Sequence, residues 1–239
     1  MSAMPPSTPK PITEVWRPEL TRLPALSPAR RAFRSFSHGL AKTIAGLCLN
    51  ITVEGIENLP AHGPALLAIN HLGDADVAAV IASLPYPPDA LSKVELYDLP
   101  ILGKLIDYYG VIWLHRGQPD RRALRAALDG LAEGRVILIA PEGRYSTTGA
   151  LEEGSDGIAF LAYKAHVPVI PIGIIGTENE NVYSHLKKFK RAPVQIRIGK
   201  MLRLDEQATG RKEALEIGKQ MVMKALASLL PERYRGVYS

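Results

Sequence analysis

The chain has 239 residues, 46% of them hydrophobic, and a mean hydropathy of +0.01, a composition typical of one globular domain with a sizeable core. A formal charge of +5 and a pI near 9.3 favour an anionic partner, which could be nucleic acid, a lipid headgroup or a phosphorylated substrate. The single cysteine, Cys48, excludes intrachain disulfides and multi-cysteine metal sites, and we interpret it as a core residue.

Residues 1–27 contain six prolines, which predicts an extended and poorly ordered arm. The segment lacks the basic start and apolar core of a secretory signal, so no signal peptide is expected. No stretch approaches the roughly 20 apolar residues that a membrane-spanning helix requires. The sequence therefore predicts no transmembrane helix.

A helix is predicted over residues 28–48, with Ser27 as its cap and Pro28 at its first position. Apolar side chains recur at helical spacing and basic side chains accompany them, which makes this an amphipathic basic helix. The apolar positions are Phe33, Phe36, Leu40, Ile44 and Leu47, and the basic positions are Arg30, Arg31, Arg34 and Lys42. Two interpretations remain open: the helix packs on the core, or it lies in an anionic membrane interface.

Residues 49–239 alternate short β-rich runs with helical patterns. Strands are predicted at 51–55, 64–70, 110–115, 135–140, 167–175 and 194–199, and helices at 76–83, 120–131, 156–165 and 211–229. This alternation predicts a single α/β domain with a largely parallel central sheet flanked by helices. Ligands of such sheets bind beyond the carboxyl ends of the strands, so His71, Arg116 and Glu142, each just after a strand, are predicted to share one site.

His71 and Asp76 stand at the end of a predicted buried strand, in the stretch NHLGDADV. A turn between strand and helix would let the carboxylate hold one imidazole nitrogen and leave the other to accept a proton from a hydroxyl. Asp74 is interpreted as a helix cap. The spacing alone is weak evidence, because it recurs at His115 and Asp120.

Four segments occur in order: the His-x4-Asp stretch, GVIWLHR (110–116), PEGRYS (141–146) and VPVIPI (167–172). Together they resemble the four sequence blocks of the glycerolipid acyltransferases, the family of 1-acylglycerol-3-phosphate acyltransferases, over about residues 51–204. The resemblance implies that His71 and Asp76 are catalytic. It places His115 at a variable position, so its match to Asp120 is interpreted as coincidence.

The same resemblance assigns substrate-binding residues. The arginine of the second block falls on Arg116, and the glutamate and glycine of the third block fall on Glu142 and Gly143. The family's common Glu-Gly-Thr-Arg-Ser reads Glu-Gly-Arg-Tyr-Ser here, which places arginine one position early, at Arg144. The stretch SKVELYDLPILGKL is similar to the segment between the first two blocks and places Lys93 near the acceptor headgroup.

The chemistry implied is transfer of a fatty acyl group from a CoA or acyl carrier protein thioester to a hydroxyl of lysophosphatidic acid or a related glycerolipid. His71 would be the general base and Asp76 its orienter. Three cations would hold anionic groups: Lys93, Arg116 and Arg144. Glu142 would bind an acceptor hydroxyl or hold one of these cations. No cofactor is expected, and no metal site, since no second histidine lies at ligand spacing from His71.

Several alternatives remain. One is an acyltransferase for a different acceptor. Another is a membrane-binding thioesterase or hydrolase, although the sequence has no Gly-x-Ser-x-Gly nucleophile motif. A nucleic-acid-binding module could use the basic run HLKKFKR (185–191), but aromatic residues are only 6% of the chain, and no nucleic-acid partner is expected. The expectation is a peripheral enzyme of phospholipid biosynthesis on the cytoplasmic face of an anionic membrane.

Overall fold

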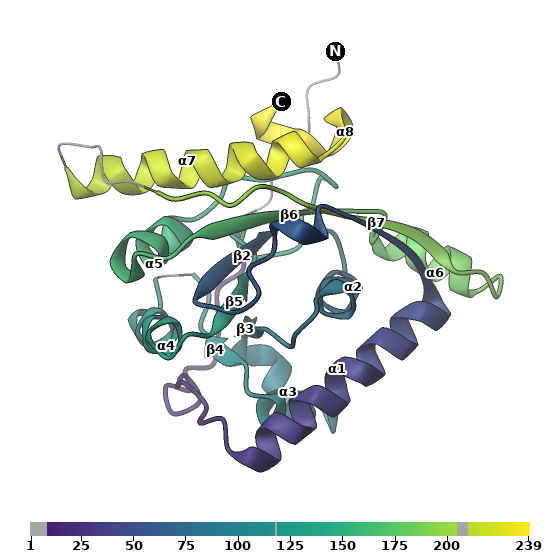
Figure 1. The fold of residues 1–239 in the computed structure, drawn as a ribbon, viewed down its shortest axis with the longest axis horizontal. Helices are drawn as coiled ribbons and strands as arrows, with labels where there is room; N and C mark the ends of the chain where they lie inside the picture. The colour runs from purple at the N-terminus through teal and green to yellow at the C-terminus, as the bar shows by residue number, and fades with distance from the viewer. Residues whose placement is uncertain (1–8, 118, 205–209) are drawn as a thin grey trace.

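The structure, a computed structural model, describes residues 9–117, 119–204 and 210–239. A seven-stranded sheet runs through it in the order β1-β7-β6-β2-β5-β3-β4 (Figure 1). The strands are β1 (Leu49–Glu54), β2 (Ala65–Ile69), β3 (Asp89–Lys93), β4 (Ile112–Leu114), β5 (Val136–Ile139), β6 (Val169–Ile175) and β7 (Ala192–Ile198). The helices are α1 (Pro28–Cys48), α2 (Asp76–Ser83), α3 (Leu102–Tyr109), α4 (Arg121–Ala132), α5 (Gly157–Ala165), α6 (Asn179–Leu186), α7 (Arg211–Leu229) and α8 (Glu232–Arg235).

All neighbouring strands are parallel except β6 and β7, which pair antiparallel, so the predicted largely parallel α/β sheet is confirmed. The sequence did not predict β3, α3, α6 and α8. β3 reads Asp-Ala-Leu-Ser-Lys and lacks the apolar run of a buried strand. It forms because β5 and β4 pair with it on either side.

Helices cover both faces of the sheet, and each face has its own core (Figure 1). One core joins the sheet to α1, α2, α3 and α6 through residues such as Ala45, Val80 and Val182. The other joins it to α4, α5 and α7 through residues such as Ala127 and Leu226. β2 and β5 are buried on both faces, which explains their unbroken apolar sequences.

Helix α1 has the predicted bounds, and Ser27 caps it by accepting a hydrogen bond from the N–H of Arg30. Its buried side is polar. Arg34 forms an ion pair with Asp89, and Nε2 of His38 donates to the carbonyls of Ile81 and Leu84 at 3.0 and 3.1 Å. Arg34 is therefore an interior residue and not part of an outward-facing basic surface as the sequence pattern predicted.

The opposite side of α1 is apolar and exposed. It consists of Phe36, Leu40, Ile44 and Leu47, called here the α1 stripe, with Phe36 65% and Leu47 73% exposed. Phe33 differs from these, since its ring packs edge-on against Tyr108 with centroids 4.8 Å apart. Within the described ranges, no helix combines the length and apolar composition required to cross a bilayer.

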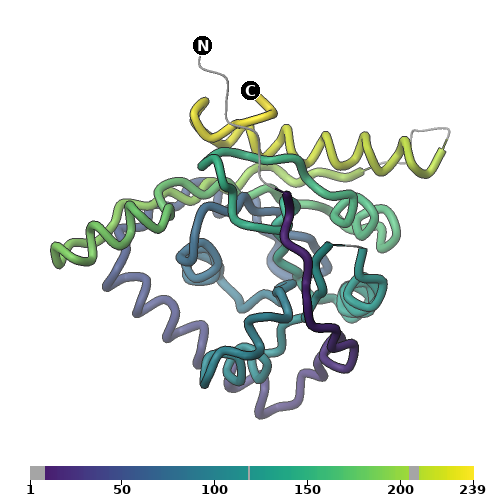
Figure 2. The backbone as a smooth tube through the Cα atoms, turned by 180° about the vertical axis from the view of Figure 1, so that it is seen from behind, coloured from purple at the N-terminus to yellow at the C-terminus, as the bar shows by residue number. Residues whose placement is uncertain are grey.

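Residues 9–27 of the predicted loose arm lie along the domain and make specific contacts, whereas residues 1–8 fall outside the described residues (Figure 2). Thr13 exchanges backbone and side-chain hydrogen bonds with Arg116 at 3.0 and 2.7 Å. The N–H of Arg17 donates to Nε2 of His115 at 2.9 Å. Proline content predicted poor order for this segment, but these partners, distant in sequence, hold residues 9–17 in place.

Candidate active site

The predicted site residues follow four neighbouring strands. His71 follows β2, Glu142 follows β5, Lys93 ends β3 and Arg116 follows β4. These strands are adjacent in the order β2-β5-β3-β4 and all run parallel, so their carboxyl ends meet at one edge of the sheet. The prediction that these residues share one edge is therefore consistent with the topology.

Asn70 fixes the backbone just before His71. Its buried amide donates to the carbonyl of Ile174 at 2.9 Å and accepts from the N–H of Ile174 at 2.7 Å, which extends the pairing between β2 and β6 beyond the strand. Sequence reasoning assigned Asn70 no role. The available signal was a polar residue in an apolar strand, since a buried amide must be paired.

His71 and Asp76 form the predicted pair. Nδ1 of His71 lies 2.6 Å from Oδ2 of Asp76, which also accepts the N–H groups of Leu72 and Gly73 at 2.6 and 2.9 Å. Asp76 is fully buried and starts α2, and the His71 side chain is 17% exposed. Since a carboxylate only accepts, Nδ1 carries the proton of the neutral ring and Nε2 presents a lone pair.

The turn that carries this pair is tightly held. Gly73 leaves room for the chain, because a Cβ there would lie 2.6 Å from the carbonyl oxygen of Thr177. The N–H of Ser146 donates to the His71 carbonyl at 2.7 Å. The backbone that carries His71 is therefore held by residues distant in sequence.

His115 and Asp120 form a second pair of the same geometry, with Nδ1 and Oδ2 2.9 Å apart. Here the remaining nitrogen is occupied, because Nε2 accepts the N–H of Arg17. The ring is buried and lies against Trp16, with centroids 4.2 Å apart. This pair holds the N-terminal segment and has no ring nitrogen left for a substrate. Its role is therefore structural. Its geometry serves that role and is not the coincidence that the sequence suggested.

Glu142 is almost fully buried and organises the loop after β5. Its carboxylate accepts the N–H of His71 at 3.2 Å and the N–H of Glu152 at 2.7 Å. Burial raises the pKa of Glu142 to about 8, although these two N–H groups favour its charged form. The neighbouring Gly143 has φ +73°, a left-handed turn conformation that favours glycine. Glu142 thus holds the backbone at His71, and the predicted contact to an acceptor hydroxyl or a cation stays a prediction.

Arg144 is only 8% exposed. Its Nε and Nη2 donate to Oε2 of Glu152 at 2.8 and 2.6 Å, and Nη1 donates to the carbonyl of Pro9 at 2.9 Å. The guanidinium therefore ties the loop to the N-terminal segment. The phosphate contact predicted for Arg144 would have to compete with Glu152, and it stays a prediction.

Arg116 is also paired, with Nη2 2.9 Å from Oε1 of Glu95, and its backbone is held by Thr13. The predicted phosphate contact would have to compete with this carboxylate. Lys93 is different, because its Nζ lies 5.6 Å from the ring centroid of Tyr145 and that ring packs edge-on against His71, 4.2 Å between centroids. Of the three predicted cations, Lys93 is the one that this stack connects to His71.

Tyr145 and Asp74 complete the surroundings of His71. Burial and the hydrogen-bonded Asp74 carboxylate raise the pKa of Tyr145 above its ordinary value, so its hydroxyl keeps its proton. Tyr183 of α6 also donates to Asp74, at 2.8 Å. Asp74 therefore binds two tyrosines and is not the helix cap that the sequence predicted; the capping position is Ala75.

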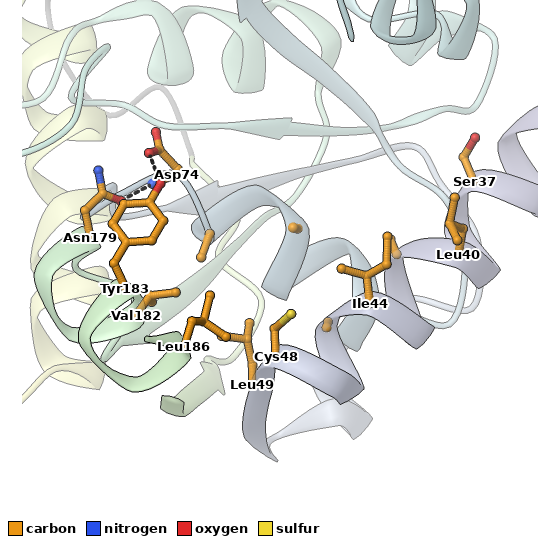
Figure 3. A pocket seen from close by; sticks show the side chains of 14 residues that line it. Ser37, Leu40, Ile44, Cys48, Leu49, Asp74, Asn179, Val182, Tyr183 and Leu186 are labelled. Atoms are coloured by element: carbon orange, nitrogen blue, oxygen red, sulfur yellow. Dashed lines mark hydrogen bonds between the residues drawn. The ribbon is translucent and has the colours of Figure 1, made fainter. Parts of the chain in front are cut away.

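An apolar groove of about 430 Å³ ends at Asp74 (Figure 3). It runs between α1, the start of α2 and α6, with Asp74 and Tyr183 at one end and Ser37 and Leu40 at the other. Part of the α1 stripe, Leu40 and Ile44, lines it. In the described part of the chain, no group of three or more His, Cys, Asp or Glu side chains could hold a metal ion.

Comparison with known proteins identifies the family. The sequence model of the acyltransferase family matches residues 50–175. The chain is 32% identical over 151 residues to an Arabidopsis thaliana chloroplast 1-acyl-sn-glycerol-3-phosphate acyltransferase, covering 60% of this chain and 42% of that protein. A Bacillus subtilis 1-acyl-sn-glycerol-3-phosphate acyltransferase is 27% identical over 169 residues, covering 70% of this chain and 81% of that protein.

The chain thus spans less than half the length of the chloroplast relatives that it matches. Among solved structures, the 1-acyl-sn-glycerophosphate acyltransferase PlsC of Thermotoga maritima has the same fold, with a TM-score of 0.63, 22% identity and coverage of 85% of this chain and 84% of that one. The family match includes His71, Asp76 and Glu142 and extends over more than half of the chain. As the four blocks predicted, the chain belongs to the acyltransferase family.

Proposed function

We propose that this chain is a 1-acylglycerol-3-phosphate O-acyltransferase that moves a fatty acyl group from a CoA or acyl carrier protein thioester to the hydroxyl of lysophosphatidic acid. The observation that carries the proposal is the His71 and Asp76 pair, in which Nδ1 is occupied by the buried carboxylate. No hydrogen bond from the described residues occupies Nε2. Relatives with this activity in their names support the choice of acceptor.

The reaction follows from that geometry. Nε2 of His71 takes the proton of the acceptor hydroxyl as its oxygen attacks the thioester carbonyl. Asp76 holds the imidazole in the required tautomer and stabilises the imidazolium. The C–S bond then breaks, and the departing thiolate takes the proton from the imidazolium to leave as a thiol. Ester formation is therefore balanced by release of free CoA or carrier-protein thiol.

Two features near His71, a cation and an apolar groove, suit lipid substrates. Lys93 is placed to attract the acceptor phosphate, because its ammonium lies over the Tyr145 ring that contacts His71. The groove between α1 and α6 is lined almost entirely by apolar side chains and ends at Asp74, three residues from His71, which suits the acyl chain of a substrate.

The enzyme would work at a membrane surface, with the α1 stripe in the lipid interface, because this stripe presents apolar side chains opposite the buried polar side of the helix. Exchanging Phe36 and Leu47 for serine should release the protein from anionic vesicles without lowering its thermal stability. Phe33→Ser is the matched contrast: this ring packs on Tyr108, so its loss should cost stability.

Incubation with acyl-CoA, or acyl carrier protein thioester, and lysophosphatidic acid tests the activity. Phosphatidic acid as the product supports the proposal, whereas free fatty acid would indicate a thioesterase. A panel of acceptors, including a lysolipid without phosphate, tests the headgroup. Preferred use of that acceptor would contradict lysophosphatidic acid as the substrate and favour an acyltransferase for a different lipid.

A further inference from the structure

The segment between α6 and β7 carries four basic residues in a run of five. Residues 187–191 read Lys-Lys-Phe-Lys-Arg and are called here the basic turn. All five are exposed, and Phe189 is 100% exposed. The turn projects from the body of the molecule at the end of the sheet where α1 also ends (Figures 1 and 2). Neither the catalytic pair nor the groove uses it.

Phe189 has an unfavourable backbone conformation for a side chain of its size, and its ring contributes no packing to the fold. Its φ is +53°, a left-handed conformation that glycine or asparagine adopts with less strain. Hydrogen bonds from the N–H of Phe189 to Leu186 and of Lys190 to His185, both 3.0 Å, hold this conformation. A fully exposed ring adds no packing in return. The two hydrogen bonds form the C-terminal cap of α6, which accounts for the φ of Phe189. The observation that points to a partner is the full exposure of a large apolar ring at a position where glycine is usual.

The charges indicate which kind of surface that partner presents. Within the described residues, the four basic side chains of the turn form no ion pair with a carboxylate. Arg191 donates a hydrogen bond to the carbonyl of Gly46 at 3.2 Å. This bond joins the turn to the last turn of α1, next to the exposed Leu47. The surface thus combines cations with apolar side chains from two elements.

We propose that the basic turn is a second membrane contact, in which Phe189 enters the boundary between headgroups and acyl chains while the lysines and Arg191 bind the phosphates of anionic lipids. Nucleic acid would also offer phosphates, but it has no apolar layer for Phe189 and Leu47 to enter together. The proposal rests on the proposed function only in that its substrates are lipids.

Two contacts determine orientation as well as affinity. The α1 stripe alone leaves the molecule able to rotate about the helix axis on the membrane. The basic turn adds a contact near the end of α1 and beside α6, the two helices that border the groove. With both engaged, the groove lies next to the lipid from which an acyl chain has to enter.

Vesicle co-sedimentation of the full chain tests this inference. The probes are vesicles of phosphatidylcholine alone and of phosphatidylcholine with phosphatidylglycerol, at low and at moderate salt. The test variants are Phe189→Ser and the triple exchange of Lys187, Lys188 and Lys190 to glutamine. The matched control exchanges Lys164, Lys212 and Lys224, exposed residues of α5 and α7, to glutamine and removes the same charge elsewhere.

We expect the triple variant to bind anionic vesicles about 100-fold more weakly at low salt, and Phe189→Ser about tenfold more weakly, with the control within threefold of wild type. Equal loss in the control, or wild-type binding by Phe189→Ser, would overturn the proposal. Loss of binding to a single-stranded oligonucleotide with vesicle binding intact would assign the turn to nucleic acid and overturn it too.

A second measurement separates this inference from the proposed function. Short-chain acyl-CoA and short-chain lysophosphatidic acid are monomeric in water, and the variants should use them at the wild-type rate without vesicles. If the wild type turns over neither substrate yet binds anionic vesicles through the turn, the proposed function fails and this inference stands. A loss of the soluble activity in Phe189→Ser would place the ring in the substrate site and overturn it.

Discussion

Exchanging each of the two paired histidines for alanine should separate catalysis from stability. His71→Ala should remove the proposed general base, a loss that typically costs about 10²- to 10⁴-fold in rate. Its side chain is partly exposed and makes one hydrogen bond, to Asp76, so folding should survive. His115→Ala should leave the rate with saturating substrates within a few-fold of wild type, because both ring nitrogens are occupied within the protein.

The stability effects should run in the opposite direction. His115 is buried, and its loss removes the bond to Asp120 and leaves the N–H of Arg17 without its acceptor. Two partly buried hydrogen bonds with one partner left unpaired are worth about 2–4 kcal/mol in the free energy of unfolding. For a chain of this length that lowers the melting temperature by about 5–15 °C.

Both quantities can be measured on the same preparations, as the rate of phosphatidic acid formation and the midpoint of thermal or urea unfolding. The assignment of the two histidines requires a crossed result: a large loss of rate with normal stability for His71→Ala, and the reverse for His115→Ala. Equal losses of rate in the two folded variants would refute it, as would a greater loss for His115→Ala.

Three further predictions concern the residues around the pair. Between about pH 4.5 and 8, Glu142 is protonated in the folded protein and ionised in the unfolded chain. Its contribution to stability is therefore lost as the pH rises through this window. Glu142→Gln should flatten the pH dependence of the free energy of unfolding, measured in urea, over the same range. Arg144→Ala should lower the free energy of unfolding by about 3 kcal/mol, because it removes the ion pair of the buried Glu152 carboxylate, whose Oε1 keeps its two hydrogen bonds from Thr147. A selective rise in acceptor KM with unchanged stability would instead support the predicted phosphate contact. Lys93→Ala should raise the KM for lysophosphatidic acid about tenfold and leave that for a lysolipid without phosphate unchanged; equal rises for both would remove Lys93 from the headgroup site.

The hydrogen-bonded pair of His71 and Asp76 could be predicted from the sequence because its geometry is local. His71 and Asp76 lie five residues apart on one turn, and any chain that folds a strand, a turn and a helix there brings them together. The same locality produced the second pair, and no local feature distinguishes the two. The difference is the N–H of Arg17, which comes from nearly a hundred residues away.

The carboxylate partners of the two arginines could not be predicted for a related reason. A motif shows that a guanidinium is near a site but not whether a carboxylate already holds it. Glu152 is the carboxylate partner of Arg144, and Glu95 is that of Arg116. Neither glutamate belongs to the four blocks, although Glu95 lies two residues after Lys93 in the similar stretch between the first two.

Helix α1 illustrates what periodicity can and cannot determine. The spacing of its apolar residues gave the helix and its bounds, but an apolar side packs inward in most helices of globular proteins. Here Arg34 and His38 occupy the inner side, because they find buried partners there: Asp89 for Arg34, and two carbonyls at the end of α2 for His38. Such partners are visible only once the chain is folded.

That inner side makes α1 a poor target for truncation. A chain shortened to start at β1 would lose the amphipathic helix. It would expose the buried Asp89 and leave Arg135 as its ion-pair partner among the described residues. It would also remove the His38 donor from the last carbonyls of α2. The wall of the groove formed by Leu40 and Ile44 would disappear with it. A preparation intended for handling without detergent would keep the helix and exchange its outer residues, Phe36 and Leu47, for polar ones.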